Sequence, residues 1–116
     1  MILTYRYQIK NRSAAVELSQ YARAVNFVWN YCVARQRDTE ARYRAGAPKR
    51  RWPTRFDLQN ATAGTSRELG IHAGSVQETC RVFAISRDKA KRAPRFRASA
   101  GARRALGWVP FRASDR

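Results

Sequence analysis

Histidine and carboxylate side chains, on which most enzyme active sites depend, are scarce in this sequence. It has one histidine, His72, and eight Asp and Glu residues that are scattered singly along the chain. No two carboxylates share an apolar helical face in a way that suits general acid–base or metal-assisted catalysis. The P-loop, GxSxG and HExxH patterns are also absent. The sequence therefore predicts a protein that is not an enzyme and holds neither metal nor cofactor, with His72 as an ordinary surface residue in a loop.

Cysteines and long apolar runs are few as well. Cys32 and Cys80 lie far apart and neither belongs to a CxxC pair, which argues against a disulfide framework or a zinc site. No apolar run reaches the roughly 18 residues that a membrane-spanning helix needs. Charged and polar residues interrupt residues 1–7 before a signal peptide could form. The sequence thus predicts no membrane partner and a cytoplasmic location.

Positive charge is what the sequence has in abundance. The 24 Lys and Arg residues give a formal net charge of +16, and 20 of the 24 are arginine. A compact fold with this charge repels itself unless a polyanion neutralises it. Arginine also makes bidentate phosphate contacts and stacks on bases. A GC-rich genome favours arginine codons too, but it does not explain the net charge, so the composition indicates a nucleic-acid partner.

The first ten residues alternate between apolar and polar side chains, which predicts a β-strand over residues 1–10 with one buried face. The apolar face carries Leu3, Tyr5, Tyr7 and Ile9. The polar face carries Arg6 and Lys10, which could meet phosphate. Residues 106–111 are the only other short strand expected, and Gly107 and Pro110 confine it to an edge. Two short strands leave open edges through which the chain could associate with itself.

Helical periodicity dominates the middle of the chain, from residue 14 to 92. A long helix is predicted from Ala14 to about Ala45, with Ser13 as its N-cap. Its apolar stripe consists of Leu18, Tyr21, Ala22, Val25, Val28, Trp29, Cys32 and Val33. The stripe fades where Arg35, Arg37, Arg42 and Arg44 gather. We therefore expect a buried first half and a second half that faces solvent or a ligand.

Two further helices carry capping-box spacings. Thr54 and Asp57 predict the start of a short helix that runs through Leu58 to Ala61. Residues 63–66 are predicted as a loop. The last helix is predicted to start at Gly74-Ser75, with Ser75 and Glu78 as its capping box, and to stop before Pro94. Its inner stripe is Val76, Cys80, Phe83 and Ala84.

An irregular, basic tail from residue 93 to 116 completes a mostly α-helical α+β arrangement, predicted as one nucleic-acid-binding segment over residues 1–116. Three places put cations beside aromatic rings, namely residues 49–52, 95–97 and 107–112. Single-stranded nucleic acid needs this mixture, because phosphates require charge and bases require a stacking face. In the alternative interpretation, Trp108 and Phe111 are core residues of a sheet and the charges are solvated. The predicted nucleic-acid contacts are Arg6, Lys10, Lys49, Arg50, Arg51, Trp52, Arg87, Lys89, Lys91, Arg92, Arg95, Phe96, Arg97, Arg103 and Arg104.

The order of these features carries a family resemblance. A tyrosine-rich basic strand precedes a helix that contains Phe27-Val28-Trp29-Asn30, a later helix starts at Ser75, and Pro94-Arg95-Phe96-Arg97 leads into an aromatic strand. From Tyr5 to Arg112, with a weak middle between residues 52 and 72, this order resembles the N-terminal region of OrfB/TnpB proteins. These are transposon-encoded relatives of type V CRISPR effectors, and the region is described there as a helix-turn-helix.

The resemblance implies part of an RNA-guided DNA endonuclease that holds a guide-type RNA, transposon DNA or both. It places Tyr5, Tyr7, Val28 and Trp29 at structural positions and Arg95 and Arg97 at the nucleic-acid interface. The sequence ends at Arg116, before the family's RuvC-like carboxylates and Cys-rich zinc element. An incomplete fragment of a larger fold, without cleavage activity, is therefore expected.

Two other functions remain open on the sequence alone. A freestanding RNA-binding protein of the ribosomal type would share the charge and need no further domain. A helix-turn-helix regulator would instead read half-sites on duplex DNA, because phosphate contacts alone carry no sequence information. The sequence does not indicate whether the chain prefers RNA or DNA.

Overall fold

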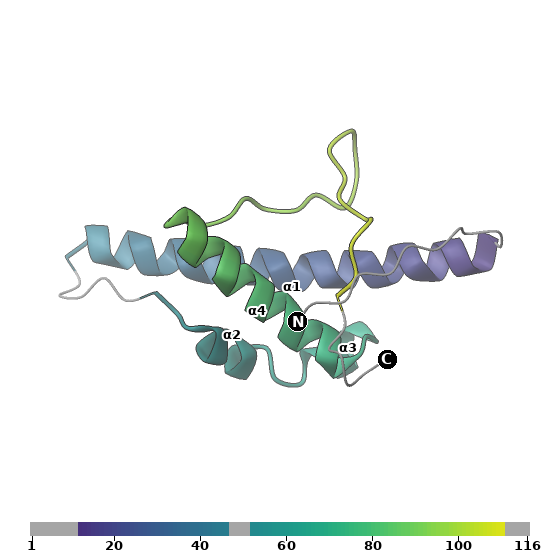
Figure 1. The fold of residues 1–116 in the computed structure, drawn as a ribbon, viewed down its shortest axis with the longest axis horizontal. Helices are drawn as coiled ribbons and strands as arrows, with labels where there is room; N and C mark the ends of the chain where they lie inside the picture. The colour runs from purple at the N-terminus through teal and green to yellow at the C-terminus, as the bar shows by residue number, and fades with distance from the viewer. Residues whose placement is uncertain (1–11, 47–51, 111–116) are drawn as a thin grey trace.

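One long helix sets the dimensions of the molecule. The computed structural model describes residues 12–46 and 52–110, and α1 (Arg12–Arg44) contains 33 of them. At 1.5 Å per residue such a helix is about 50 Å long, which matches the longest molecular extent of 53 Å. In Figure 1, α4 (Ala73–Ala90) crosses α1 obliquely, and the segment that follows it returns along α1. The helices α2 (Arg55–Ala61) and α3 (Thr65–Leu69) both pack against α4.

The prediction of a mostly helical chain is confirmed, whereas the strand predicted at residues 106–111 is wrong over its described part. Residues 106–110 form no strand, and the described residues contain only an isolated bridge between Ala98 and Arg104. A strand needs a neighbour for its ladder, and no described segment pairs with residues 106–110. The strand predicted over residues 1–10 lies outside the described residues.

The long helix forms as its periodicity predicts. It starts earlier than expected, however, and a different part of it is buried. Ser13 lies inside α1 rather than at its N-cap. Burial is concentrated in the middle of the helix, from Ala22 to Gln36, while Leu18 is 42% exposed. The expectation of a buried first half is therefore confirmed only from Ala22 onward, because α4 and the tail cover only the middle of α1. The exposed end beyond Gln36 agrees with the prediction.

The core lies where α1 and α4 cross. It joins Val25, Val28, Trp29, Cys32 and Val33 of α1 to Val76, Cys80 and Phe83 of α4, with Leu58 from α2 and Ile71 from the connecting loop. The predicted inner stripe of α4 is confirmed by the burial of all four members. The Trp29 ring meets Phe83 edge-on, with centroids 5.5 Å apart, a geometry that the charge distribution of aromatic rings favours.

The two cysteines meet inside this core. Both are free thiols, and the Cys32 thiol donates to Cys80 Sγ across 3.9 Å. This hydrogen bond and burial raise the pKa of the Cys32 thiol. A protonated, buried thiol reacts poorly, so the pair acts as apolar filling between α1 and α4.

The start of α2 follows its sequence signature closely. The Thr54 N–H donates to Asp57 Oδ2 at 2.9 Å, and the Asp57 N–H donates to Thr54 Oγ1 at 3.1 Å, which completes the predicted capping box. The loop predicted at residues 63–66 instead leads into the short helix α3. Gly64 and Gly70 flank it at φ of +86° and +69°, values that glycine adopts without steric cost.

The capping box predicted at Ser75 is wrong. The N-cap of α4 is His72, whose Nδ1 accepts the Gly74 N–H at 3.2 Å, so this exposed residue is more than an ordinary surface side chain. Ser75 is buried, with Oγ 2.9 Å from the Tyr21 hydroxyl oxygen. Because Ser75 is bonded to α1, it is not available as a cap. At the other end α4 stops at Ala90, with Lys91 in the left-handed region at φ +57°, two residues before the predicted end of the helical region.

The Tyr21 hydroxyl connects α1 to the start of α4, and a variant without this hydroxyl tests the connection. Its hydroxyl contacts Ser75 Oγ and accepts the His72 N–H at 2.8 Å. We expect Tyr21→Phe to lower the free energy of unfolding by about 1–2 kcal/mol, because two polar groups lose a partner. Urea denaturation measures this, and Tyr43→Phe, at an exposed site on the same helix, is the matched control. Equal stability of the two variants would contradict the assignment.

Candidate nucleic-acid interface

The basic tail is held on α1 by side chains that bond its backbone. The Trp29 Nε1–H donates to the Arg95 carbonyl at 2.8 Å. Asn30 bonds both backbone groups of Arg97, donating to its carbonyl at 2.9 Å and accepting its N–H at 2.7 Å. A segment without helix or sheet partners needs such bonds, because its backbone groups otherwise lose hydrogen bonds when they leave water. Residues 95–97 are therefore fixed on the surface of α1.

A second anchor holds the loop that follows. The Asn26 side chain is almost completely buried and donates to the Ala105 carbonyl at 2.7 Å and to Ser99 Oγ at 3.2 Å. Its carbonyl oxygen accepts Arg97 Nε at 2.8 Å. In Figure 1 the loop between these contacts projects away from the helices. Arg103 and Arg104 belong to this loop, and both are exposed.

Arg97, which was predicted to contact nucleic acid, has a structural position. Its guanidinium lies 5.1 Å from the Trp108 ring centroid and 5.7 Å from that of Trp29. Burial lowers the pKa of this guanidinium, but an arginine pKa is ordinarily so high that the group stays charged. Between two indoles and bonded to Asn26, Arg97 connects the tail to α1. Trp108 packs edge-on against Trp29 at 6.1 Å, which favours the core interpretation of that residue.

Phe96 lies outside this core although its neighbour Arg97 is half-buried. Half of its surface, 50%, is exposed, and the Arg37 guanidinium of α1 lies 4.7 Å from the ring centroid. Phe96 is therefore a surface residue and not part of the core. Arg37 was missed in the sequence because only the fold brings it to the tail. The pair places a cation and an aromatic ring together at the surface, a combination that nucleic-acid-binding proteins use to stack bases and contact phosphates.

Further exposed cations lie along the same stretch of chain as Phe96. They are Lys89, Lys91, Arg92 and Arg95. We call these four residues, together with Phe96 and Arg37, the tail surface. No ion pair among the described residues joins these four cations to a protein carboxylate. Free cations that flank an exposed ring can contact phosphates on either side of a stacked base.

Arg87 is the predicted contact that the structure removes from the interface. It is 4% exposed, and its guanidinium donates to the Pro53 carbonyl, to Gln36 Oε1 at 3.1 Å and to Asp88 Oδ1 at 3.0 Å. The Trp52 ring lies beside the same guanidinium at 5.3 Å. With its donors occupied inside the protein, Arg87 joins α4 to α1 and to the segment before α2. It is not placed to meet phosphate.

The remaining predicted contacts lie elsewhere. Trp52 is half-buried and its Nε1–H donates to Glu40 of α1. Arg6, Lys10, Lys49, Arg50 and Arg51 lie outside the described residues. Within residues 12–46 and 52–110, no group of three or more His, Cys, Asp or Glu side chains could hold a metal ion. No helix among them is long and apolar enough to cross a membrane.

Comparisons with known proteins identified no relative of this chain. No protein-family model, no curated protein sequence and no solved structure matches the chain. The candidate interface therefore depends on the geometry and charge of its own residues.

Substitution of Arg87 tests its structural role. We expect Arg87→Met to lower the free energy of unfolding by about 3–5 kcal/mol, because buried partners of a charged group are left unpaired. Urea denaturation measures the loss. Lys89→Met, at an exposed site in the same turn of α4, should change stability by less than about 0.5 kcal/mol. An Arg87→Met protein as stable as the Lys89→Met protein would show that the buried bonds are unimportant.

Proposed function

We propose that the chain binds single-stranded nucleic acid on the tail surface, through phosphate contacts and stacking on Phe96. The observation that carries this proposal is a half-exposed aromatic ring with a guanidinium 4.7 Å from its centroid, on a backbone segment fixed to α1. An unpaired base can reach such a ring, whereas bases inside a duplex already stack on each other. No catalytic step belongs to the proposal.

The backbone around Phe96 is already fixed before a ligand binds, and this favours binding. Ordering a flexible segment on binding costs free energy, at about 0.5–1.5 kcal/mol for each side chain with many rotamers. Asn30 and Trp29 already hold the backbone on both sides of Phe96. The cations around it keep their long side chains exposed, so they can follow phosphates of varied spacing. The arrangement suits binding that tolerates many sequences, since stacking and phosphate contacts read few base edges.

The resemblance to OrfB/TnpB proteins leads to a more specific proposal. We propose that the chain is a nucleic-acid-binding portion of a transposon-encoded protein related to RNA-guided nucleases. Supporting it, two of the motifs that carry the resemblance, residues 27–30 and 94–97, contact each other, because Trp29 and Asn30 bond the backbone of Arg95 and Arg97. Motifs that form one contact are expected to occur together in a sequence. This role would bring a guide-type RNA or transposon DNA to the tail surface.

Salt dependence tests the phosphate contacts. If Lys91, Arg92 and Arg95 each meet one phosphate, replacing all three with alanine should reduce the slope of log K against log salt by about 2 to 3. Fluorescence anisotropy with a labelled single-stranded oligonucleotide, in a series of salt concentrations, measures the slope. The matched control replaces Arg23, Arg55 and Arg67, which are exposed elsewhere, and removes the same charge. Equal slopes for the two triple variants would contradict the assigned surface.

Stacking is tested at Phe96 itself. Phe96→Ala should weaken oligonucleotide binding by about 1–3 kcal/mol and leave the salt slope unchanged, because a ring contact releases no counterions. Phe56→Ala is the matched control, since Phe56 is 59% exposed and has the Arg55 guanidinium at 4.7 Å from its ring. Both variants should keep wild-type helical circular dichroism. Equal losses of affinity in the two variants would contradict stacking on Phe96, and tighter binding to one duplex sequence would favour a helix-turn-helix regulator.

A further inference from the structure

The loop of residues 98–105 stands clear of the helices and carries Arg103 and Arg104. Figure 1 shows it projecting from the segment that follows α4, and residues 100–104 are all exposed. We propose that this loop binds duplex DNA by inserting Arg103 into the minor groove of an A·T-rich tract. The inference goes beyond the proposed single-strand binding, because it adds a second ligand at a place outside the tail surface.

The base of the loop is closed by hydrogen bonds, some of which come from a buried side chain. The Ala105 N–H donates to the Ala98 carbonyl at 2.7 Å. The Asn26 amide, on α1, donates to the Ala105 carbonyl at 2.7 Å and to Ser99 Oγ at 3.2 Å. Because Asn26 is 1% exposed, these bonds fix both ends of the loop on the core. A loop that is already fixed costs less free energy to order when a ligand binds.

Arg103 occupies a central position of the turn at the tip of the loop. The Arg104 N–H donates to the Gly101 carbonyl at 3.3 Å, the hydrogen bond typical of a four-residue β-turn. Gly101 has a φ of +85°, which glycine adopts without steric cost. The Arg104 guanidinium donates to the same carbonyl at 3.2 Å, so this arginine stabilises the turn. The Arg103 guanidinium is exposed and has no hydrogen bond or ion pair within the described part of the chain, so it is available to a ligand.

The side chains of the loop suit a narrow groove better than an unpaired base. Residues 98–102 are Ala, Ser, Ala, Gly and Ala, so Arg103 and Arg104 are the only long side chains. The minor groove of B-DNA is about 6 Å wide, and proteins insert arginine side chains into it. The small neighbours of Arg103 let the turn approach the edges of such a groove. The loop has no aromatic ring on which a base of a single strand could stack.

A·T-rich DNA favours this contact for two reasons. Its minor groove is narrow, and the stronger negative potential there attracts inserted arginine. G·C pairs, in contrast, place the guanine 2-amino group in the minor groove, where one donor would face another. Duplex RNA has a wide, shallow minor groove that would not enclose a guanidinium. We therefore expect the loop to prefer A·T-rich DNA to both G·C-rich DNA and duplex RNA.

Fluorescence anisotropy with three DNA duplexes of equal length and charge tests the groove contact on the whole chain. Their central pairs are A·T, G·C or inosine·cytosine, and inosine keeps the major-groove edge of guanine but lacks the 2-amino group. We expect the A·T and inosine·cytosine duplexes to bind several-fold more tightly than the G·C duplex. A helix in the major groove would instead bind the inosine·cytosine and G·C duplexes equally, and this result would overturn the proposal. Arg103→Ala should weaken binding of the A·T duplex about tenfold, the size of one charge-assisted contact, and remove the preference.

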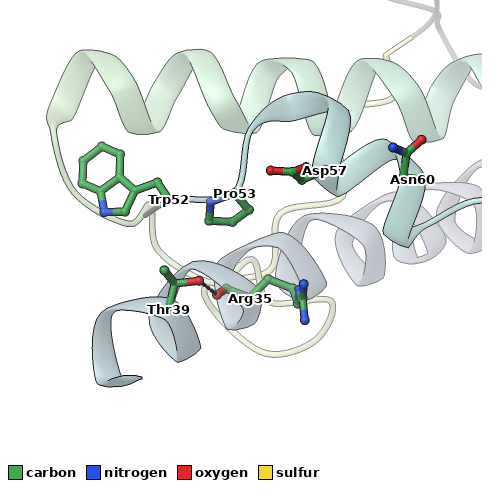
Figure 2. A pocket seen from close by; sticks show the side chains of 6 residues that line it. All are labelled: Arg35, Thr39, Trp52, Pro53, Asp57 and Asn60. Atoms are coloured by element: carbon green, nitrogen blue, oxygen red, sulfur yellow. Dashed lines mark hydrogen bonds between the residues drawn. The ribbon is translucent and has the colours of Figure 1, made fainter. Parts of the chain in front are cut away.

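Arg35 provides the matched control. It is exposed on α1 and lies beside a hollow of about 310 Å³ rather than on a projecting turn. Figure 2 shows the lining of this hollow, which consists of Arg35, Thr39, Trp52, Pro53, Asp57 and Asn60. Arg35→Ala removes the same charge and should keep the preference for the A·T duplex. Equal effects of Arg35→Ala and Arg103→Ala, or equal binding of the A·T and G·C duplexes by the wild-type chain, would overturn the groove contact.

A single-stranded oligonucleotide separates the loop from the tail surface. Arg103→Ala should leave the affinity for this oligonucleotide nearly unchanged, and Phe96→Ala should keep the preference for the A·T duplex. Loss of that preference in the Phe96→Ala protein would overturn the assignment to the loop. A wild-type chain that prefers the A·T duplex but binds no single strand would support the loop and refute the proposed function. A chain that binds single strands but shows no preference for A·T pairs would overturn the loop alone.

Discussion

Amide side chains on α1 decide where the basic tail lies. Residues 91–110 have neither a helix nor a sheet to pair their backbone groups, so those groups need other partners when they pack on the core. Asn26 and Asn30 provide them, and Trp29 adds the indole N–H. The exposure of Phe96 follows from this docking, because its neighbour Arg97 is turned toward the indoles of the core. Without these side chains of α1, the tail would have no fixed surface to offer a ligand.

The arginines of this protein divide into two physical classes, which composition alone cannot separate. Arg87 and Arg97 lie among aromatic rings and donate to amide or carbonyl oxygens inside the protein. A planar guanidinium suits such sites because it stacks on a ring while its edge still donates. Arg92 and Arg95 are exposed and can meet solvent or phosphate. The net charge of +16 therefore overstates the charge available to a ligand.

Local rules predicted the elements of this fold that depend on neighbours in sequence. The spacing of apolar residues gave α1 and the inner stripe of α4, and the pair Thr54 and Asp57 gave the capping box of α2. The rules failed where a distant residue decides the outcome. Ser75 has the spacing of a cap but is bonded to Tyr21 on α1. For the same reason the sequence pointed to Phe96 and Arg95 but could not show Arg37, which only the docking of the tail brings to the ring.

The exposed end of α1 connects the fold with the proposed binding. Beyond Gln36 the helix leaves the core, and its ion pair between Arg42 and Asp38 is exposed and contributes no more than about 0.5 kcal/mol. This end also contacts two aromatic residues, since Glu40 accepts from Trp52 and Arg37 lies over Phe96. Phe96 and Arg37 belong to the tail surface proposed for nucleic acid. A strand bound there would screen the Arg37 charge and contact the exposed end of α1, so binding should stabilise this end of the helix.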